Sequence, residues 1–244
     1  MLASTPFIAP GGVFAIQPPI PVPTPVQAYS VHGSQKELIA ILKKNLPEEV
    51  RPLTTNEEQD IAAILSVNYR VQVAPRVKGI RLNRTYGLIG QEQHLPRYPG
   101  DSINDQLTSE EDANLYAKYG MTAGKGAWGY FANSRGELSK EDIEREKYYI
   151  AVQTFLAPGW DEHVSEYRDF FKYRKMLVVN PENGKAVVAD IADAGPGAST
   201  GKHLGGSPEV MKYLERFDGK QRGPVLYFFV DDKNGTIPLG PVNI

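Results

Sequence analysis

Two apolar runs joined by an Asn-Gly pair constrain this chain more than any other feature. Residues 176–179 and 186–191 are rich in β-branched and other apolar side chains, and Asn183-Gly184 lies between them. Such a pair favours a tight β-turn, because Asn and Gly adopt positive φ angles readily. Residues 176–191 are therefore predicted to form a β-hairpin at the centre of a sheet.

The chain from residue 124 onward is rich in glycine, aromatic and β-branched residues. Residues 127–131, 148–152 and 225–230 are further predicted strands. Short helices are predicted from Ser139, over 161–171, and from Ser207, where Pro208 suits the first helical position. Short strands with glycine-rich connections favour a small barrel, and the alternation of strands with long helices that marks a parallel sheet is absent.

The N-terminal half carries signals for helices. Ser34 with Glu37 and Thr55 with Glu58 each form a predicted capping box before apolar residues at helical spacing. Pro47 separates the two helices, so they are predicted to form a helical hairpin whose apolar faces pack on the rest of the protein.

Less regular segments follow the helical hairpin. Residues 69–74 and 81–90 carry weak strand signals, and residues 95–101 suggest a rigid loop. Thr108 with Glu111 then predicts a third helix, which Gly120 ends.

The composition changes along the chain predict three parts. Residues 1–30 form a proline-rich tether, with seven prolines between positions 6 and 25. This tether is either an irregular chain end or a stiff spacer that leaves room for a membrane anchor upstream. Residues 31–122 form a helical accessory region with ordered loops, and residues 123–244 form the barrel.

Charge and composition exclude several classes of function. The net charge is −2, from 27 Lys and Arg against 29 Asp and Glu, so no overall field would attract nucleic acid. The chain has no cysteine, which excludes disulfides, thiolate catalysis and cysteine-type zinc sites. The histidines show no metal-binding spacing, and no cofactor is predicted. The N-terminus lacks an intact signal peptide, so export would mean that a leader has been removed.

The order of elements near the C-terminus resembles that of a known fold. A hairpin, the segment Asp193-Ala194-Gly195-Pro196, a polar glycine loop, a short helix and a last strand resemble the double-psi β-barrel of rare lipoprotein A-type lytic transglycosylases, and more distantly expansins and family 45 endoglucanases. The resemblance covers the last third of the chain. It implies a mainly β protein with α additions, in which an N-terminal helical layer accompanies a C-terminal six-stranded double-psi β-barrel.

The same resemblance implies a function and a location. We expect an extracellular or cell-envelope protein that binds or cleaves peptidoglycan-like polysaccharide, as a lytic transglycosylase does. The alternative is a noncatalytic glycan-binding or surface-scaffold module.

Asp193 is the catalytic residue that the resemblance nominates. It matches the aspartate of the family's Asn-Asp-Arg-Gly-Pro motif, and Trp128 and Tyr130 match an early Ser-Trp-Tyr-Gly segment that lies beside the glycan groove. The chain departs from the family in two places. Gly205-Gly206-Ser207 replaces an Asp-Leu-Ser motif, and no histidine lies near Ala151. These departures favour the noncatalytic alternative or a mechanism with a single acid. Asp193 could equally cap the turn that follows it.

Other residues are candidates on chemical grounds. His203 and Lys202 lie in the glycine-rich loop, where His203 could serve as an acid or base near neutral pH and Lys202 could contact substrate. The phosphate-loop interpretation of this loop fails on spacing, because Pro196 and His203 occupy positions that need Gly and Ser or Thr. Trp160 is a candidate for stacking on a sugar ring.

A second carboxylate would have to come from elsewhere. Asp190 is three residues from Asp193, so in a regular strand the two side chains point to opposite sides. Glu92, Asp101 and Asp105 are therefore the predicted sources of a second acid.

Overall fold

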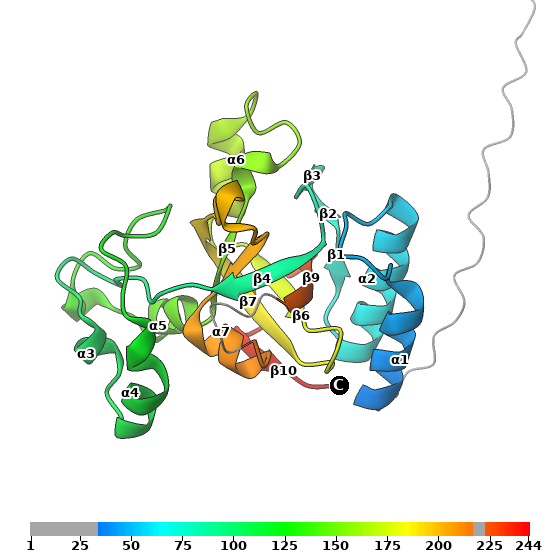
Figure 1. The fold of residues 1–244 in the computed structure, drawn as a ribbon. Helices are drawn as coiled ribbons and strands as arrows, with labels where there is room; N and C mark the ends of the chain where they lie inside the picture. Colours follow the sequence, from blue (N-terminus) through cyan, green and yellow to red (C-terminus); the bar gives the residue numbers. More distant parts are fainter. Residues whose placement is uncertain (1–33, 217–222) are drawn as a thin grey trace, which may run out of the picture.

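A closed six-stranded barrel forms the centre of the computed structural model, which describes residues 34–216 and 223–244 (Figure 1). The predicted tether at 1–30 lies outside the described residues. The barrel strands are β4 (Tyr86–Gln91), β5 (Tyr149–Val152), β6 (Lys175–Val179), β7 (Ala186–Ala194), β8 (Leu204–Gly206) and β9 (Gly223–Val230). The structure thus has the predicted six-stranded barrel with added helices.

The barrel closes in the order β9-β4-β8-β5-β7-β6 and back to β9. The β4–β8 and β5–β7 pairs are parallel, and the other four pairs are antiparallel. Two short strands lengthen the sheet, β1 (Val73–Ala74) beside β9 and β10 (Gly240–Val242) beside β7. Strands β2 (Arg76–Val77) and β3 (Ile80–Arg81) form a separate hairpin.

The predicted β-hairpin is confirmed as β6 and β7. The two strands pair in antiparallel register from Lys175 opposite Asp190 to Val179 opposite Ala186. Gly184 has a φ of 68° in the turn, and the Asn183 side chain accepts a hydrogen bond from the Lys185 amide at 2.9 Å. The Asn-Gly pair therefore supplies the positive φ and the local hydrogen bond that the turn requires.

Alternate residues of the barrel strands pack in two apolar layers. One layer fills the barrel interior and includes Val178, Val187 and Phe229. The other lies outside the barrel and includes Leu177, Val188 and Phe228. The outer layer is covered by α1 (Gln35–Asn45) and α2 (Thr55–Tyr69), which contribute Leu38, Leu42, Ile61, Ile64 and Leu65. The helical hairpin is thus packed against the barrel as an accessory layer.

The capping box of α2 lies one residue before the predicted one. Thr54 is the N-cap and accepts from the Glu57 amide, while the Glu57 carboxylate accepts from the Thr54 amide at 2.7 Å. Glu58 instead is buried and accepts hydrogen bonds from Thr85 at 2.9 Å and from Arg81 at 3.0 Å. Because Thr54 is the N-cap, the residue three positions later that completes the box is Glu57, and Glu58 is left to bond to the segment before β4.

A matched pair of substitutions tests this register. Thr54→Ala is expected to lower the free energy of unfolding by about 1 kcal/mol, because the amide of Glu57 loses its side-chain acceptor. Thr55→Ala is expected to change it little, because alanine suits the first helical turn. Urea denaturation of both variants measures the change in the free energy of unfolding. A larger decrease for Thr55→Ala than for Thr54→Ala would show that Thr55 is the N-cap, as the sequence predicts.

Several other boundaries differ from the predictions. Residues 127–131 form no strand, because only Gly126 and Gly129 make a bridge and Gly129 has a φ of 96°. Strand β4 belongs to the barrel although it lies in the predicted accessory region, so the barrel begins before residue 123. The remaining α-helices are α3 (Ile103–Gln106), α4 (Glu110–Tyr116), α5 (Lys140–Lys147), α6 (Val164–Phe171) and α7 (Pro208–Tyr213). Ser109, not Thr108, caps α4, while Ser139 and Ser207 cap α5 and α7 as predicted.

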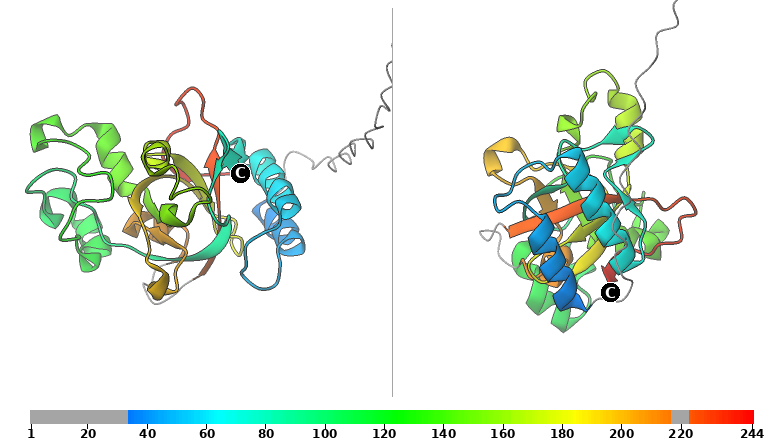
Figure 2. Two further views of the ribbon diagram at one scale, coloured as in Figure 1. Left: turned by 90° about the horizontal axis from the view of Figure 1, so that it is seen from above. Right: turned by 90° about the vertical axis from the view of Figure 1, so that its right-hand side faces the viewer.

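The connection between β4 and β5 forms a lobe of residues 92–147. Figure 2 shows this lobe, with α3, α4 and α5, on the side of the barrel away from α1 and α2. The barrel therefore lies between two helical regions. The lobe covers the side of the barrel at the C-terminal end of β7.

Candidate functional site

A β-bulge places Asp190 and Asp193 on the same side of β7. Asp190 pairs with Tyr149 and Asp193 pairs with Ala151, with the register shift between Ile150 and Ala151. Tyr149 and Ala151 are two residues apart on β5 and so share a face. The prediction that the two aspartates point to opposite sides is therefore wrong, because the bulge adds one residue between them. They make no hydrogen bond to each other and do not form a close acid pair.

One oxygen of Asp193 takes both of its hydrogen bonds. Oδ1 accepts from the amides of Ala127 and Ala194, each at 2.8 Å. Burial raises the pKa of Asp193, and these two amides offset only part of the effect. Asp193 therefore does cap the adjoining backbone, and its Oδ2 is left to carry a proton. A half-buried carboxyl of this kind can donate a proton to a bound substrate.

Glu92 lies on the same outer face as Asp193. A Cβ added to Gly205 would lie 2.3 Å from Glu92 Oε1, so the Glu92 carboxylate sits directly over that glycine. Gly205 is opposite Ala151, and Ala151 is opposite Asp193. Glu92 and Asp193 thus lie on the same face, across strands β8, β5 and β7. Gly205, under Glu92, and Asp193 are two strand spacings apart, or roughly 10 Å.

Lys202 is paired with the second carboxylate. Its Nζ donates to Glu92 Oε1 at 2.7 Å and to the Gln91 carbonyl at 3.1 Å. Its methylenes lie over Gly90, where a Cβ would come within 2.2 Å of Lys202 Cδ. Lys202 therefore holds the Glu92 carboxylate over Gly205. Of the three predicted second acids, Glu92 is the one that lies on this face with Asp193.

Asp101 and Asp105 are engaged elsewhere. Asp101 is buried in a pair with Arg97, whose Nε donates at 2.9 Å. Asp105 accepts from Ser102 and pairs with Arg135 at 3.0 Å. Both aspartates order the loop that leads into α3.

His203 faces β4. Its Nδ1 accepts from the Leu88 amide at 3.0 Å, and its own amide donates to the Leu88 carbonyl at 2.8 Å. Burial lowers the pKa of His203, and nearby Arg84 lowers it further. The side chain has no contact with Asp193 through a hydrogen bond, so the structure does not bring these two predicted catalytic residues together.

The three aromatic candidates differ in what they can present to a ligand. Trp128 donates from Nε1 to the Arg168 carbonyl at 3.0 Å and packs against the barrel core. Trp160 packs against Tyr167 and Phe171. Tyr130 is 38% exposed, and Lys125 lies over its ring. Tyr130 is therefore the candidate with the most accessible ring.

Sequence reasoning missed a buried charged cluster near this face. His94 pairs with Glu146, with 3.2 Å between Nδ1 and Oε1, and Glu209 lies close enough for both to affect its pKa. Burial raises the pKa of Glu209 to about 7, although the charge of His94 opposes this. The three residues come from three separate segments, so no spacing in the sequence indicates that they meet.

Tyr149 connects the cluster to the candidate site. Its hydroxyl donates to the Gln93 carbonyl. Burial raises its pKa well above the ordinary value, and the negative charges of Glu92, Glu146 and Asp193 raise it further. The ring therefore lies among the carboxylates of both groups.

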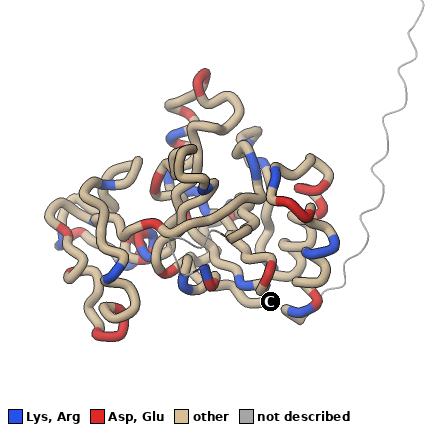
Figure 3. The backbone as a smooth tube through the Cα atoms, in the orientation of Figure 1, with Lys and Arg blue, Asp and Glu red and all other residues tan. Residues whose placement is uncertain are grey.

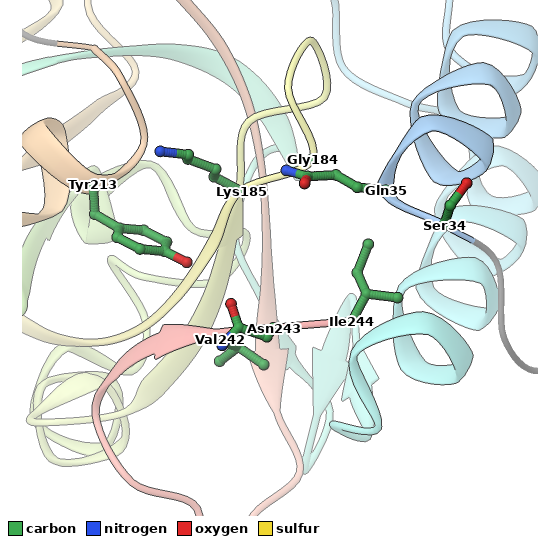
Figure 4. A pocket seen from close by; sticks show the side chains of 8 residues that line it. All are labelled: Ser34, Gln35, Gly184, Lys185, Tyr213, Val242, Asn243 and Ile244. Atoms are coloured by element: carbon green, nitrogen blue, oxygen red, sulfur yellow. The ribbon is translucent and has the colours of Figure 1, made fainter.

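The pocket in Figure 4 lies elsewhere and contains none of the predicted site residues. Its volume is about 400 Å³, and its lining includes Gln35, Lys185 and Tyr213. Across the part of the chain that the structure describes, acidic and basic residues are interspersed (Figure 3).

Within residues 34–216 and 223–244, no group of three or more His, Asp or Glu side chains is arranged to hold a metal ion. The helices in these ranges include none with the length and apolar character needed to cross a membrane. Comparison of the chain with protein-family models, with curated proteins and with solved structures finds no significant match.

Proposed function

We propose that the outer face of the barrel at Asp193 binds a peptidoglycan-like polysaccharide strand and that Asp193 protonates a glycosidic oxygen of this strand. The observation that carries the proposal is the asymmetry of the Asp193 carboxyl. Oδ1 accepts two backbone hydrogen bonds, so a proton on this side chain belongs on Oδ2. Burial favours the protonated form, which is the form that a general acid needs.

The barrel topology supports the same proposal. Six strands close with two parallel pairs, β4–β8 and β5–β7, an arrangement that is compatible with a double-psi barrel. In the transglycosylases that the sequence resembles, an aspartate at the corresponding place lies in the glycan groove. We extend the analogy to a cell-envelope location for this protein, and the analogy is one of fold and motif.

The surface beside Asp193 suits a neutral ligand. Ala151 is 2% exposed and Gly205 is buried under the Glu92 carboxylate, so a sugar ring beside Asp193 contacts side chains rather than the backbone of β8 and β5. Tyr130 offers a partly exposed ring for stacking in the same part of the protein. The Lys202–Glu92 pair leaves little net charge there.

A noncatalytic glycan-binding module is the second candidate, and the state of Glu92 favours it. Lys202 holds this carboxylate at 2.7 Å, so Glu92 is not free to serve as the second carboxylate in glycosidic cleavage. A lytic transglycosylase needs only one acid, because a hydroxyl of the substrate itself serves as nucleophile.

Digestion of purified peptidoglycan, intact and stripped of its stem peptides, tests the proposal. Products are identified by mass spectrometry, and the insoluble fraction is recovered in parallel to measure bound protein. Anhydro-muropeptides are expected from the wild type. Retained binding without products would establish the noncatalytic module, and neither binding nor products would refute a peptidoglycan function.

A further inference from the structure

A second pocket lies on the same side of β7 as Asp193. It has a volume of about 470 Å³ and is formed by α5, the start of β6, the middle of β7 and the segment 235–239. Its lining includes Arg145, Tyr173, Lys175 and Asp190. Asp190 is the residue that the bulge brings to the face of Asp193.

Asp190 is incompletely bonded although it is fully buried. The residue is 1% exposed, and its Oδ1 has no hydrogen-bond partner among the described residues. Its Oδ2 lies 3.5 Å from Arg145 Nε, which is a long contact for an ion pair. A buried carboxyl oxygen without a partner costs free energy, so a group that binds it from the pocket is stabilised there.

The neighbouring charges are already compensated. Arg145 donates to Glu141 at 2.5 Å and lies 3.6 Å from Asp142. Lys175 pairs with Asp232 at 2.7 Å. A ligand with a full charge of either sign would have to displace one of these pairs. A hydroxyl adds no charge and bonds to Asp190 in either protonation state, because it both donates and accepts.

The other walls of the pocket suit the carbon face of a sugar. Ile237, Pro238 and Leu239 line one side, and Tyr173 lines another with Arg145 stacked 4.5 Å from its ring centre. Sugars present both hydroxyls and apolar C–H faces, and carbohydrate sites combine polar groups that fix orientation with apolar surface.

The position relative to Asp193 fits one continuous ligand. Asp190 and Asp193 are opposite Tyr149 and Ala151, so they lie roughly 7 Å apart along the sheet. Tyr173 is stacked on Phe131, with ring centres 5.8 Å apart. Both rings pack on a small apolar cluster of Leu95, Tyr149 and Ala192, and Ala192 lies between the two aspartates in β7. Aromatic surface thus adjoins both acids.

We propose that the pocket at Asp190, Arg145 and Tyr173 is a second sugar-binding subsite for the polysaccharide strand that passes Asp193. The inference rests on the glycan function proposed above and adds a place where a further sugar of the same strand is held. Asp190 accepts from a sugar hydroxyl, and the segment 235–239 contacts the apolar face of the ring.

Binding measurements with long, peptide-free peptidoglycan strands test the subsite by calorimetry. Asp190→Asn is expected to raise Kd about tenfold, because the amide nitrogen replaces a carboxyl oxygen that accepts from the sugar hydroxyl. Thr236→Trp, at the exposed rim of the pocket, is expected to raise Kd similarly by filling the space, without altering Asp190. Asp60→Asn, at an exposed position of α2, is the matched control and is expected to bind like the wild type.

The outcomes separate the subsite from the wider proposal. Wild-type affinity in both pocket variants would reject the subsite while leaving the function at Asp193 intact. Absence of strand binding by the wild type would refute the glycan function, and the subsite with it. If Asp190→Asn fails to fold, as thermal unfolding would reveal, Thr236→Trp alone decides between these results.

Discussion

Asp193→Asn is expected to reduce the release of anhydro-muropeptides by about 100-fold or more, because a general acid contributes 10²–10⁴ to the rate. The fold should survive, since the Asn side-chain oxygen can still accept from the amides of Ala127 and Ala194. Binding to insoluble peptidoglycan should remain near the wild-type level. Product release quantified by mass spectrometry, alongside the pull-down, measures both effects.

The pH dependence gives an independent check on this role. Burial raises the pKa of Asp193, so the protonated form persists to higher pH than for an ordinary aspartate. Cleavage should therefore fall as the pH rises through this pKa. Asp169→Asn, at an exposed position of α6, serves as the control and should retain activity. Wild-type product yield from Asp193→Asn would exclude Asp193 as the proton donor.

Glu209→Gln is expected to remove much of the pH dependence of stability. Burial raises the pKa of Glu209 from 4.5 to about 7, so in the folded protein it stays protonated when the unfolded chain has already lost the proton. The contribution of Glu209 to the free energy of unfolding is thus fully present below pH 4.5. It is lost as the pH rises to about 7, a decrease of roughly 3 kcal/mol. The glutamine is neutral throughout and should keep that stability at pH 8.

The neighbours of Glu209 act in the same direction. Burial lowers the pKa of His94, but its hydrogen bond to Glu146 and the negative charges of Glu146 and Glu209 together outweigh this and leave the pKa raised. The stability that protonated His94 contributes is also lost as the pH rises. Urea denaturation between pH 4 and pH 8 measures the slope, with Glu48→Gln as an exposed control. If the free energy of unfolding changed with pH in the same way for the wild type and for Glu209→Gln, Glu209 would ionise normally in the folded protein.

Local sequence signals predicted those parts of the fold that depend on neighbouring residues. The Asn183-Gly184 turn and the caps at Ser34, Ser139 and Ser207 act within a few positions of the chain, and the structure has all four. The assignment of β4 to the barrel could not be predicted in this way. Its parallel partner, β8, follows more than 100 residues later, and no local pattern reports that pairing.

The candidate site was predictable for single residues but not for their arrangement. Asp193 could be nominated from its motif, whereas the orientation of Asp190 depends on a bulge that alternation of side chains does not reveal. Glu92 reaches the face of Asp193 because Gly205, on a different strand, leaves space for its carboxylate. The loop at 127–131 was predicted as a strand from its aromatic residues, yet Trp128 packs against the barrel core, Phe131 packs against a separate small cluster, and Tyr130 is partly exposed.

The lobe of residues 92–147 buries few large apolar side chains. Leu95 and Tyr98 are its buried large hydrophobic side chains, and neither α3 nor α4 contains a buried residue. The buried polar side chains of the lobe, His94 with Glu146 and Arg97 with Asp101, pair with each other inside it. Segments with so little apolar burial open at a lower free energy than the whole protein unfolds. Backbone amides of α3 and α4 should therefore exchange with deuterium through local opening, while those of β6 and β7 exchange only when the barrel unfolds.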